Sequence, residues 1–300
     1  MPSLRARLSA QALSLLLRPR LDPQQTPEDQ RRALERFSKL QHMPRGVATE
    51  AVQLGARPAL KFTPRQADAG RTLLYLHGGA YCIGSPAAFR VMTAQLALSA
   101  RCTVYSLDYR LAPEHPYPAA LDDALAAYHK LAAQHPAARI ALAGDSAGAG
   151  LALVLAQQLP EASLPMAACL LLFCPFADLG LSGASLQRNR HREPLLTREW
   201  LALCSEFYAA ETPREDPRIS PLYGRFDHLP PMLIQAAGND LLLDDARRLH
   251  ATAREAGAHS KLEVFADLGH DFQVQSGLVP EARRALVMAG AFAKAHQQIN

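Results

Sequence analysis

The sequence predicts an α/β fold in which a mostly parallel, twisted sheet is flanked by helices. The main observation is that short apolar runs alternate with longer helical segments from residue 71 onward. Such alternation is typical of right-handed crossovers, which place successive strands parallel in one sheet. The chain also has 300 residues, 49% of them hydrophobic. This is enough for a large core in one domain with an insertion, or in two small domains.

The expected strands are short apolar runs that are followed within two residues by glycine, proline or a charged side chain. Runs of this kind are typical of strands that are buried on both faces of a parallel sheet. They are Leu73–Leu76, Cys102–Leu107, Ile140–Ala143, Ala167–Phe173, Met232–Ala237 and Leu262–Phe265. A weaker alternation over Val47–Phe62 predicts a hairpin at the edge of the sheet.

The expected helices are longer segments with helical patterning, many of them rich in alanine and leucine. Several begin at or just after a proline, which is favoured in the first turn of a helix. The segments are Leu4–Leu17, Pro27–Leu40, Phe89–Ala100, Ala119–Gln134, Ala149–Leu159, Thr197–Tyr208, Asp244–Ala256 and Pro280–Ala295.

The stretch Ala177–Leu229 interrupts this alternation, because it is polar and contains several prolines. We therefore expect it to be an insertion between two strands. The predicted organisation is a helical N-terminal segment (1–45), the first part of an α/β domain (46–176), the insertion (177–229) and the second part of the domain (230–300).

The charge of the chain excludes some classes of partner. Its net charge of +4 is mild, and no stripe of basic residues interleaved with aromatic ones is present, so nucleic acid is not an expected partner. The apolar piece Ala12–Leu17 is too short for a membrane span and ends at Arg18, which also makes it a poor signal-peptide core. An amphipathic helix is the favoured interpretation, and contact with a membrane surface is the alternative.

The five cysteines show no C-x-x-C pair and no cluster with histidines. Cys102, Cys169 and Cys174 lie in or next to apolar, strand-like runs and are expected to be small core residues. Their odd number and this placement predict reduced thiols and a cytoplasmic protein.

The most informative motif is the segment Gly144–Gly148, which fits the pattern G-x-S-x-G around Ser146. It lies between an expected strand and an expected helix. In this setting a serine occupies a sharp, strained turn that exposes its hydroxyl next to the free N–H groups of a helix N-terminus. An ordinary glycine-rich turn is the alternative for the motif taken by itself.

A serine nucleophile needs a histidine base that is oriented by a carboxylate, in the chain order Ser, Asp or Glu, His. Asp240 follows the expected strand Met232–Ala237, and His270 follows Leu262–Phe265. Both therefore lie at the carboxyl ends of strands, where open α/β sheets bind their ligands. We predict that Ser146, His270 and Asp240 form a catalytic triad.

Other histidines and carboxylates in this part of the chain are less suited to these two roles. His250 lies in the middle of a helix, and His259 precedes a strand, at the opposite edge of the sheet. Asp244 and Asp245 are expected to support the helix that follows Asp240. Asp267, three residues before the histidine, is the best competing acid.

Acyl transfer creates an oxyanion that requires preorganised N–H donors. The expected donors are the amides of Gly78 and Gly79, which follow the strand Leu73–Leu76, together with the amide of Ala147 beside Ser146. Glycines at the first two positions let the backbone turn its amides toward a ligand.

These residues belong to blocks that resemble the hormone-sensitive-lipase-like esterases, the bacterial group IV branch of the α/β-hydrolases. The blocks extend from about Leu73 to Phe272. They are Leu76–Tyr81 (H-G-G-G, with Ala80 for the last glycine), Asp108–Ala120, Gly144–Gly148 (G-D-S-A-G), Asp240–Asp244 (D-x-L-x-D) and His270–Phe272 (H-G-F, with Asp271 for the glycine).

The resemblance implies an α/β-hydrolase fold whose N-terminal helices and residues 177–229 form a helical cap over the site. Trp200, Phe207 and Tyr208 would line the substrate channel or form the core of the cap, and we favour core for at least two of them. Arg110, Glu114 and Asp145 are expected to hold loops in place rather than to react.

The predicted function is a serine carboxylesterase for small esters with short to medium acyl groups, acting through an acyl-enzyme intermediate. No cofactor or metal is implied, and the partner is a small-molecule ester. The alternatives are a lactone or amide hydrolase with the same triad, and a non-catalytic small-molecule receptor. A homodimer formed through the last strand or the final helix is also compatible with the sequence.

Overall fold

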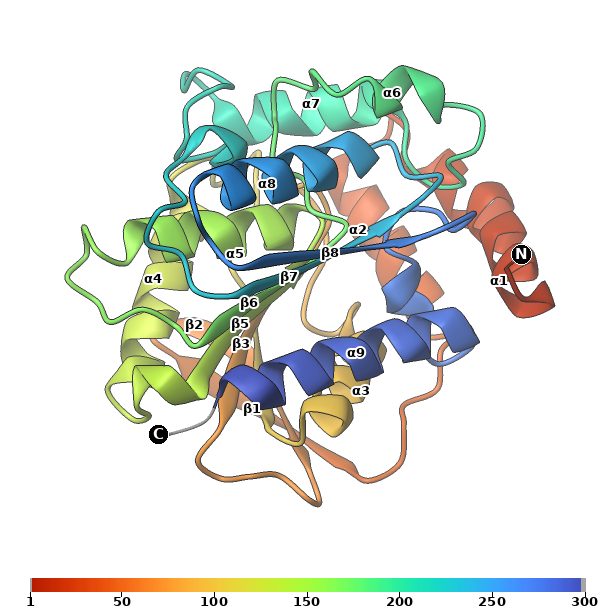
Figure 1. The fold of residues 1–300 in the computed structure, drawn as a ribbon. Coiled ribbons are helices and arrows are strands. Elements are labelled where there is room, and N and C mark those ends of the chain that lie inside the picture. Colours follow the sequence, from red (N-terminus) through yellow and green to blue (C-terminus); the bar gives the residue numbers. More distant parts are fainter. Residues whose placement is uncertain (1, 298–300) are drawn as a thin grey trace.

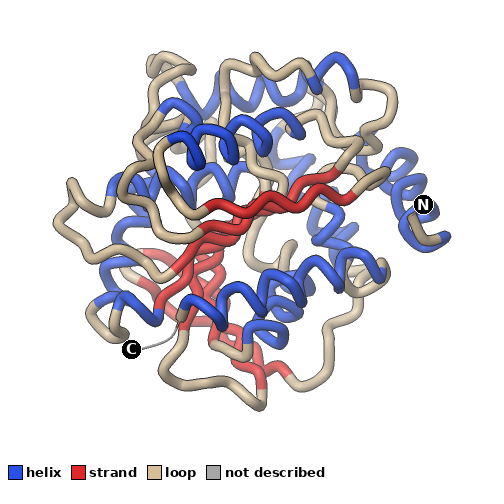
Figure 2. The backbone as a smooth tube through the Cα atoms, viewed as in Figure 1, coloured by secondary structure: helices blue, strands red, loops and turns tan. Residues whose placement is uncertain are grey.

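The computed structural model describes residues 2–297. Within them, eight strands form one twisted sheet in the order β1-β2-β4-β3-β5-β6-β7-β8 (Figure 2). The strands from β3 to β8 are parallel, whereas the hairpin β1–β2 is antiparallel and pairs with β4 at one edge. The strands are β1 (Val47–Leu54), β2 (Arg57–Pro64), β3 (Thr72–Leu76), β4 (Thr103–Leu107), β5 (Ile140–Asp145), β6 (Cys169–Phe173), β7 (Met232–Ala237) and β8 (Ser260–Phe265).

The helices form a layer on each face of the sheet (Figure 1). Helices α3 and α9 cover one face, and α4, α5 and α8 cover the other. Every residue of β3, β5, β6 and β7 is buried, as expected for parallel strands between two helical layers. The helices are α1 (Leu4–Ala12), α2 (Pro27–Ser38), α3 (Arg90–Ala100), α4 (Ala119–Ala132), α5 (Ala147–Gln158), α6 (Ser185–Arg188), α7 (Arg198–Ala209), α8 (Leu243–Glu255) and α9 (Pro280–His296). The α/β fold predicted from the sequence is therefore confirmed.

The inserted segment 177–229 contains α6 and α7, and it lies above α5 and α8 in Figure 1. The N-terminal helices α1 and α2 lie beside the ends of β7 and β8. Side chains join the two segments: Trp200 on α7 donates its indole N–H to Gln30 on α2 over 2.7 Å, and Arg18 donates to the carbonyl of Glu193 over 2.7 Å.

The N-terminal helix differs from the expected single helix Leu4–Leu17. It is α-helical to Ala12 and then changes to a π-helical turn over Leu13–Leu17, which ends with an i→i−5 hydrogen bond from Arg18 to Leu13. A 3₁₀ turn over Arg18–Arg20 follows, and Pro19 within it has no N–H to donate to the preceding turn. The wider turn buries both Leu13 and Leu17 on the side that faces the sheet ends.

No helix in the described part of the chain combines the length and the apolar character that crossing a membrane would require.

Candidate active site

Ser146 is the single residue between the end of β5 and the start of α5. Its backbone has φ 51° and ψ −120°, a strained conformation for a residue other than glycine. The turn is tight enough to exclude any side chain at the two flanking glycines. A Cβ on Gly144 would meet the carbonyl oxygen of Gly148 at 2.2 Å, and one on Gly148 would meet the carbonyl oxygen of Leu76 at 2.0 Å. The serine is thereby held at the carboxyl edge of the sheet.

The structure brings His270 and Asp240 to this serine from the ends of β8 and β7. His270 Nε2 lies 2.9 Å from Ser146 Oγ, and His270 Nδ1 lies 2.8 Å from Asp240 Oδ2. Asp240 Oδ1 also accepts the amide of Leu242 over 2.8 Å, which fixes the carboxylate plane. All three side chains are buried. With Nδ1–H donated to Asp240, the lone pair on Nε2 faces the serine hydroxyl, as a general base requires.

The charges around the imidazole favour its protonated form. Burial by itself would lower the pKa of His270, but the carboxylates of Asp240 and Asp271 outweigh it and raise the pKa well above its usual value. A proton on both ring nitrogens of His270 is therefore stabilised within the site.

The rival residues lie elsewhere. Asp267 is exposed. His250 Nδ1 forms a hydrogen bond with Ser260 Oγ over 2.9 Å. His259 lies at the amino end of β8, where its carbonyl accepts a hydrogen bond from the amide of Met232. Asp245 accepts the amides of Ala177 and Asp178, and thus supports the start of the inserted segment.

One of the three expected oxyanion donors already donates its hydrogen bond to another group. The amide of Gly78 donates to Asp145 Oδ1 over 2.9 Å, and the hydroxyl of Tyr75 donates to the same oxygen. The prediction for Gly78 is thus corrected: its N–H is held by a buried carboxylate behind the loop. The next residues, Gly79 and Ala80, have φ of 115° and 50° and line the cavity beside the serine.

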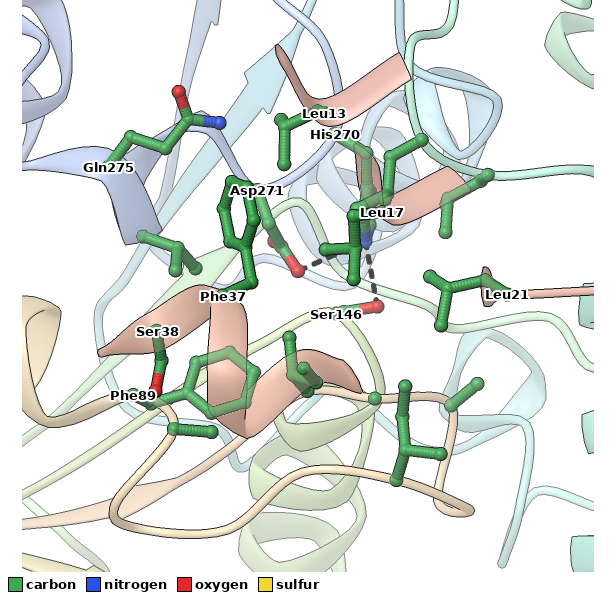
Figure 3. A pocket seen from close by; sticks show the side chains of 18 of the residues that line it. Leu13, Leu17, Leu21, Phe37, Ser38, Phe89, Ser146, His270, Asp271 and Gln275 are labelled. Atoms are coloured by element: carbon green, nitrogen blue, oxygen red, sulfur yellow. Dashed lines mark hydrogen bonds and ion pairs between the residues drawn. The ribbon is translucent and has the colours of Figure 1, made fainter. Parts of the chain in front are cut away.

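An apolar cavity opens at Ser146 (Figure 3). Leucines of the N-terminal segment form one side of it, and Phe37 of α2 and Phe89 before α3 also contribute to its wall. Trp200 of the inserted segment contributes to the wall and is itself buried, as is Tyr208, whereas Phe207 is partly buried. The leucines that line the cavity are Leu13, Leu17, Leu21, Leu34, Leu195 and Leu196.

Two carboxylates at the site were not predicted from the sequence. Glu193, in the inserted segment, accepts the backbone amide of His270 over 2.9 Å and that of Leu195 over 2.8 Å. Burial raises the pKa of Glu193 to about 7. Asp271 places a carboxylate oxygen 3.1 Å from His270 Nε2. For Asp271 the signal was its departure from the H-G-F block, whereas nothing in the sequence near Glu193 pointed to it.

Among the described residues, Cys174, Asp240 and His270 bring three metal-ligand atoms within 4.8 Å of one another. Two of these side chains are already paired with each other. Burial raises the pKa of the Cys174 thiol well above its usual value, so the thiol is a poor metal ligand. The donor set therefore fits a hydrogen-bonded pair better than a metal site.

A family model of the alpha/beta hydrolase fold matches residues 73–274. The chain belongs to the α/β-hydrolase family.

The hydrolase is 42% identical to an acetyl-hydrolase of Streptomyces hygroscopicus over 262 residues, which cover 87% of this chain and 86% of the relative. It is 36% identical to an esterase of Acinetobacter venetianus over 230 residues, or 76% of each protein. A crystal structure of an esterase from the bacterial hormone-sensitive lipase family superposes with a TM-score of 0.94 at 34% identity, covering 99% of this chain and all of the other. The resemblance predicted from the sequence is confirmed, and the hydrolase is a carboxylic ester hydrolase.

Proposed function

We propose that the chain hydrolyses small carboxylic esters with Ser146 as nucleophile, His270 as general base and acid, and Asp240 as the group that orients the imidazole. The observation that carries this proposal is the continuous line of contacts from Asp240 through His270 to Ser146, with distances of 2.8 and 2.9 Å. Ser146 Oγ attacks the ester carbonyl while its proton passes to Nε2. The imidazolium then returns the proton to the leaving alkoxide, and water hydrolyses the acyl-enzyme by the same steps.

We assign the oxyanion to the amides of Gly79, Ala80 and Ala147. Ala147 is the first residue of α5, so its amide has no partner within the helix. Gly79 and Ala80 border the cavity next to the serine, and Gly79 tolerates its positive φ at no steric cost. Ala80 replaces Gly78 in this role because the amide of Gly78 is bound by Asp145.

The proposed substrates carry short to medium acyl groups. Support comes from the apolar cavity at the serine, which offers leucine, phenylalanine and tryptophan side chains to an acyl chain and buries it from water. The relative named as an acetyl-hydrolase is consistent with the short end of this range.

The test is a series of 4-nitrophenyl esters from acetate to decanoate, together with an aliphatic lactone, assayed with the wild-type protein and Ser146→Ala. Loss of the nucleophile should lower kcat by several orders of magnitude, because removal of the nucleophile from a serine protease costs about a million-fold. Ser205→Ala, a buried serine on α7, is the matched control and should retain activity. Near-normal ester cleavage by Ser146→Ala would overturn the assignment.

A further inference from the structure

Asp271 follows the proposed base directly and has a left-handed backbone with φ 49°. This region favours glycine, and a residue with a side chain is found there mainly when local contacts hold it. The side chain of Asp271 is only 11% exposed, and it points toward His270 and Ser146 in Figure 3. A carboxylate buried in such a position requires partners that offset its desolvation.

The first partner is the catalytic nitrogen itself. Asp271 Oδ2 lies 3.1 Å from His270 Nε2, the same atom that lies 2.9 Å from Ser146 Oγ. When the imidazole is neutral, Nε2 presents a lone pair, and an ionised carboxylate at this distance gains nothing from it. When Nε2 carries the serine proton, it donates to the carboxylate as a charge-assisted hydrogen bond. The contact is therefore favourable in the imidazolium state.

The second partner is another carboxyl group. Asp145 Oδ2 and Asp271 Oδ1 are both buried and have no conventional hydrogen-bond donor within the described structure, and the two side chains lie within hydrogen-bonding reach of each other. Two adjacent buried carboxylates do not both stay ionised, and one proton between them satisfies both oxygens. Burial raises the pKa of both carboxyl groups, but His270 opposes this rise at Asp271, whereas the charge of Asp271 raises the pKa of Asp145 further. The contact of Asp271 with His270 Nε2 therefore places the proton on Asp145.

We propose that Asp271 is a second carboxylate partner of the catalytic imidazole and is kept ionised by a hydrogen bond from protonated Asp145. The inference rests on the proposed function of Ser146 and His270. The serine proton moves to Nε2 and later to the leaving alkoxide. Asp271 accepts a hydrogen bond from Nε2–H in between and takes no proton. Because Asp145 also binds the amide of Gly78, the same pair links the base to the loop that carries the oxyanion donors.

Other titratable groups surround this pair, and each comes from a different element. Those that face His270, Asp145 or Asp271 are Asp240 after β7, Glu193 in the inserted segment, Cys174 after β6, Tyr75 on β3 and Tyr109 after β4. Asp240 contacts the opposite ring nitrogen, Nδ1, and Glu193 contacts the histidine backbone. Removal of the Asp271 charge therefore changes the direct contact at Nε2 without removing the orienting acid.

The experiment compares the pH dependence of kcat/KM for wild type, Asp271→Gly and Asp267→Gly with a 4-nitrophenyl ester. Asp267 is a matched control, because it has a positive φ of 60° and precedes the histidine by three residues but is exposed. Without the Asp271 carboxylate the imidazolium is less stable, so the base is free at lower pH. The acid limb should move down by about one to three pH units, whereas Asp267→Gly should follow wild type.

Asp271→Asn removes the charge and keeps the side-chain volume, and it should shift the limb in the same direction. Asp145→Asn still offers an N–H donor to Asp271 Oδ1 and an oxygen to Gly78, so it should resemble wild type. Superimposable acid limbs for wild type and both Asp271 variants would overturn the proposal. If the acid limb of Asp145→Asn shifts as far as that of Asp271→Asn, the assignment of the shared proton to Asp145 is wrong.

A second readout separates this inference from the proposed function. In Ser146→Ala protein, NMR titration of the His270 ring measures its pKa without turnover, and Asp271→Gly in that background should lower it. If esters are still cleaved without Ser146, the proposed mechanism fails while this titration continues to report on Asp271. An unchanged His270 pKa would refute the role of Asp271 even if the triad is correct.

Discussion

Replacement of Asp240 by asparagine tests how the proposed base is oriented. In the wild-type site Asp240 Oδ2 accepts Nδ1–H of His270 over 2.8 Å, and Oδ1 accepts the amide of Leu242 over 2.8 Å. An asparagine has one oxygen and one NH₂ group at these positions. If its oxygen stays with Leu242, the NH₂ group faces Nδ1, and the imidazole adopts the tautomer with its proton on Nε2.

That tautomer cannot take the serine proton, because Nε2 already carries one. In this site the wrong tautomer is further stabilised, since Asp271 Oδ2 lies 3.1 Å from Nε2 and accepts a hydrogen bond from Nε2–H. The same exchange in a serine protease triad lowers kcat about 10⁴-fold, which corresponds to about 5 kcal/mol of transition-state stabilisation. We expect a loss of at least this size for Asp240→Asn.

The assay is kcat for a 4-nitrophenyl ester, with Asp267→Asn as the control and circular dichroism to establish folding. The control should retain activity, because Asp267 is exposed and is not among the residues that connect Asp240 through His270 to Ser146. In the double variant Asp240→Asn/Asp271→Gly the wrong tautomer loses its acceptor, so part of the activity should return. A folded Asp240→Asn protein with kcat within ten-fold of wild type, or a collapse of activity only in Asp267→Asn, would refute the reasoning.

Two further predictions concern the packing of the site. Gly148→Ala would place a Cβ 2.0 Å from the carbonyl oxygen of Leu76, so β3 and α5 must separate, and thermal stability and activity should both collapse. The control Gly183→Ala makes an ordinary contact at 3.4 Å and should melt at the wild-type temperature. Equal melting temperatures for the two variants would contradict the argument. Burial raises the folded-state pKa of Glu193 to about 7 from an ordinary value of 4.5, so the folded protein binds the proton more tightly and loses up to about 3 kcal/mol of stability as the pH rises through this window. Glu193→Gln lacks this titration, and its melting temperature relative to wild type should therefore rise between pH 4.5 and 8; parallel curves would show that Glu193 does not titrate there.

The sequence was sufficient to predict most strands of the sheet and the loops that carry Ser146, Asp240 and His270. Most of the parallel strands are apolar runs closed by a polar or glycine-rich loop, and β7 has the expected bounds Met232–Ala237. β8 is the exception, because Ser260–Phe265 contains Lys261 and Glu263 and is only partly buried at the edge of the sheet. Because the carboxyl ends of parallel strands share one edge, residues that follow β5, β7 and β8 had to meet. The contacts at 2.9 and 2.8 Å lie at that edge.

Features that depend on long-range contacts were not accessible in this way. The direction of the Gly78 amide is set by Asp145, which lies 67 residues away and reaches it only through the folded sheet. Glu193 meets the amide of His270 across 77 residues, from a polar segment with no periodicity of its own. The π-helical turn at Leu13–Leu17 also has no local sequence pattern that distinguishes it from a regular helix.

Part of the cavity wall, and with it the proposed selectivity for acyl groups, depends on the N-terminal segment of the chain. Leu13, Leu17 and Leu21 line the cavity at Ser146, although they lie outside the strands and loops that hold Ser146, Asp240 and His270. Acyl preference can therefore diverge through substitutions near the beginning of the chain while the chemistry stays constant. An exchange of residues 1–45 between relatives would alter this wall, together with the contacts that Arg18 and Gln30 make with the inserted segment.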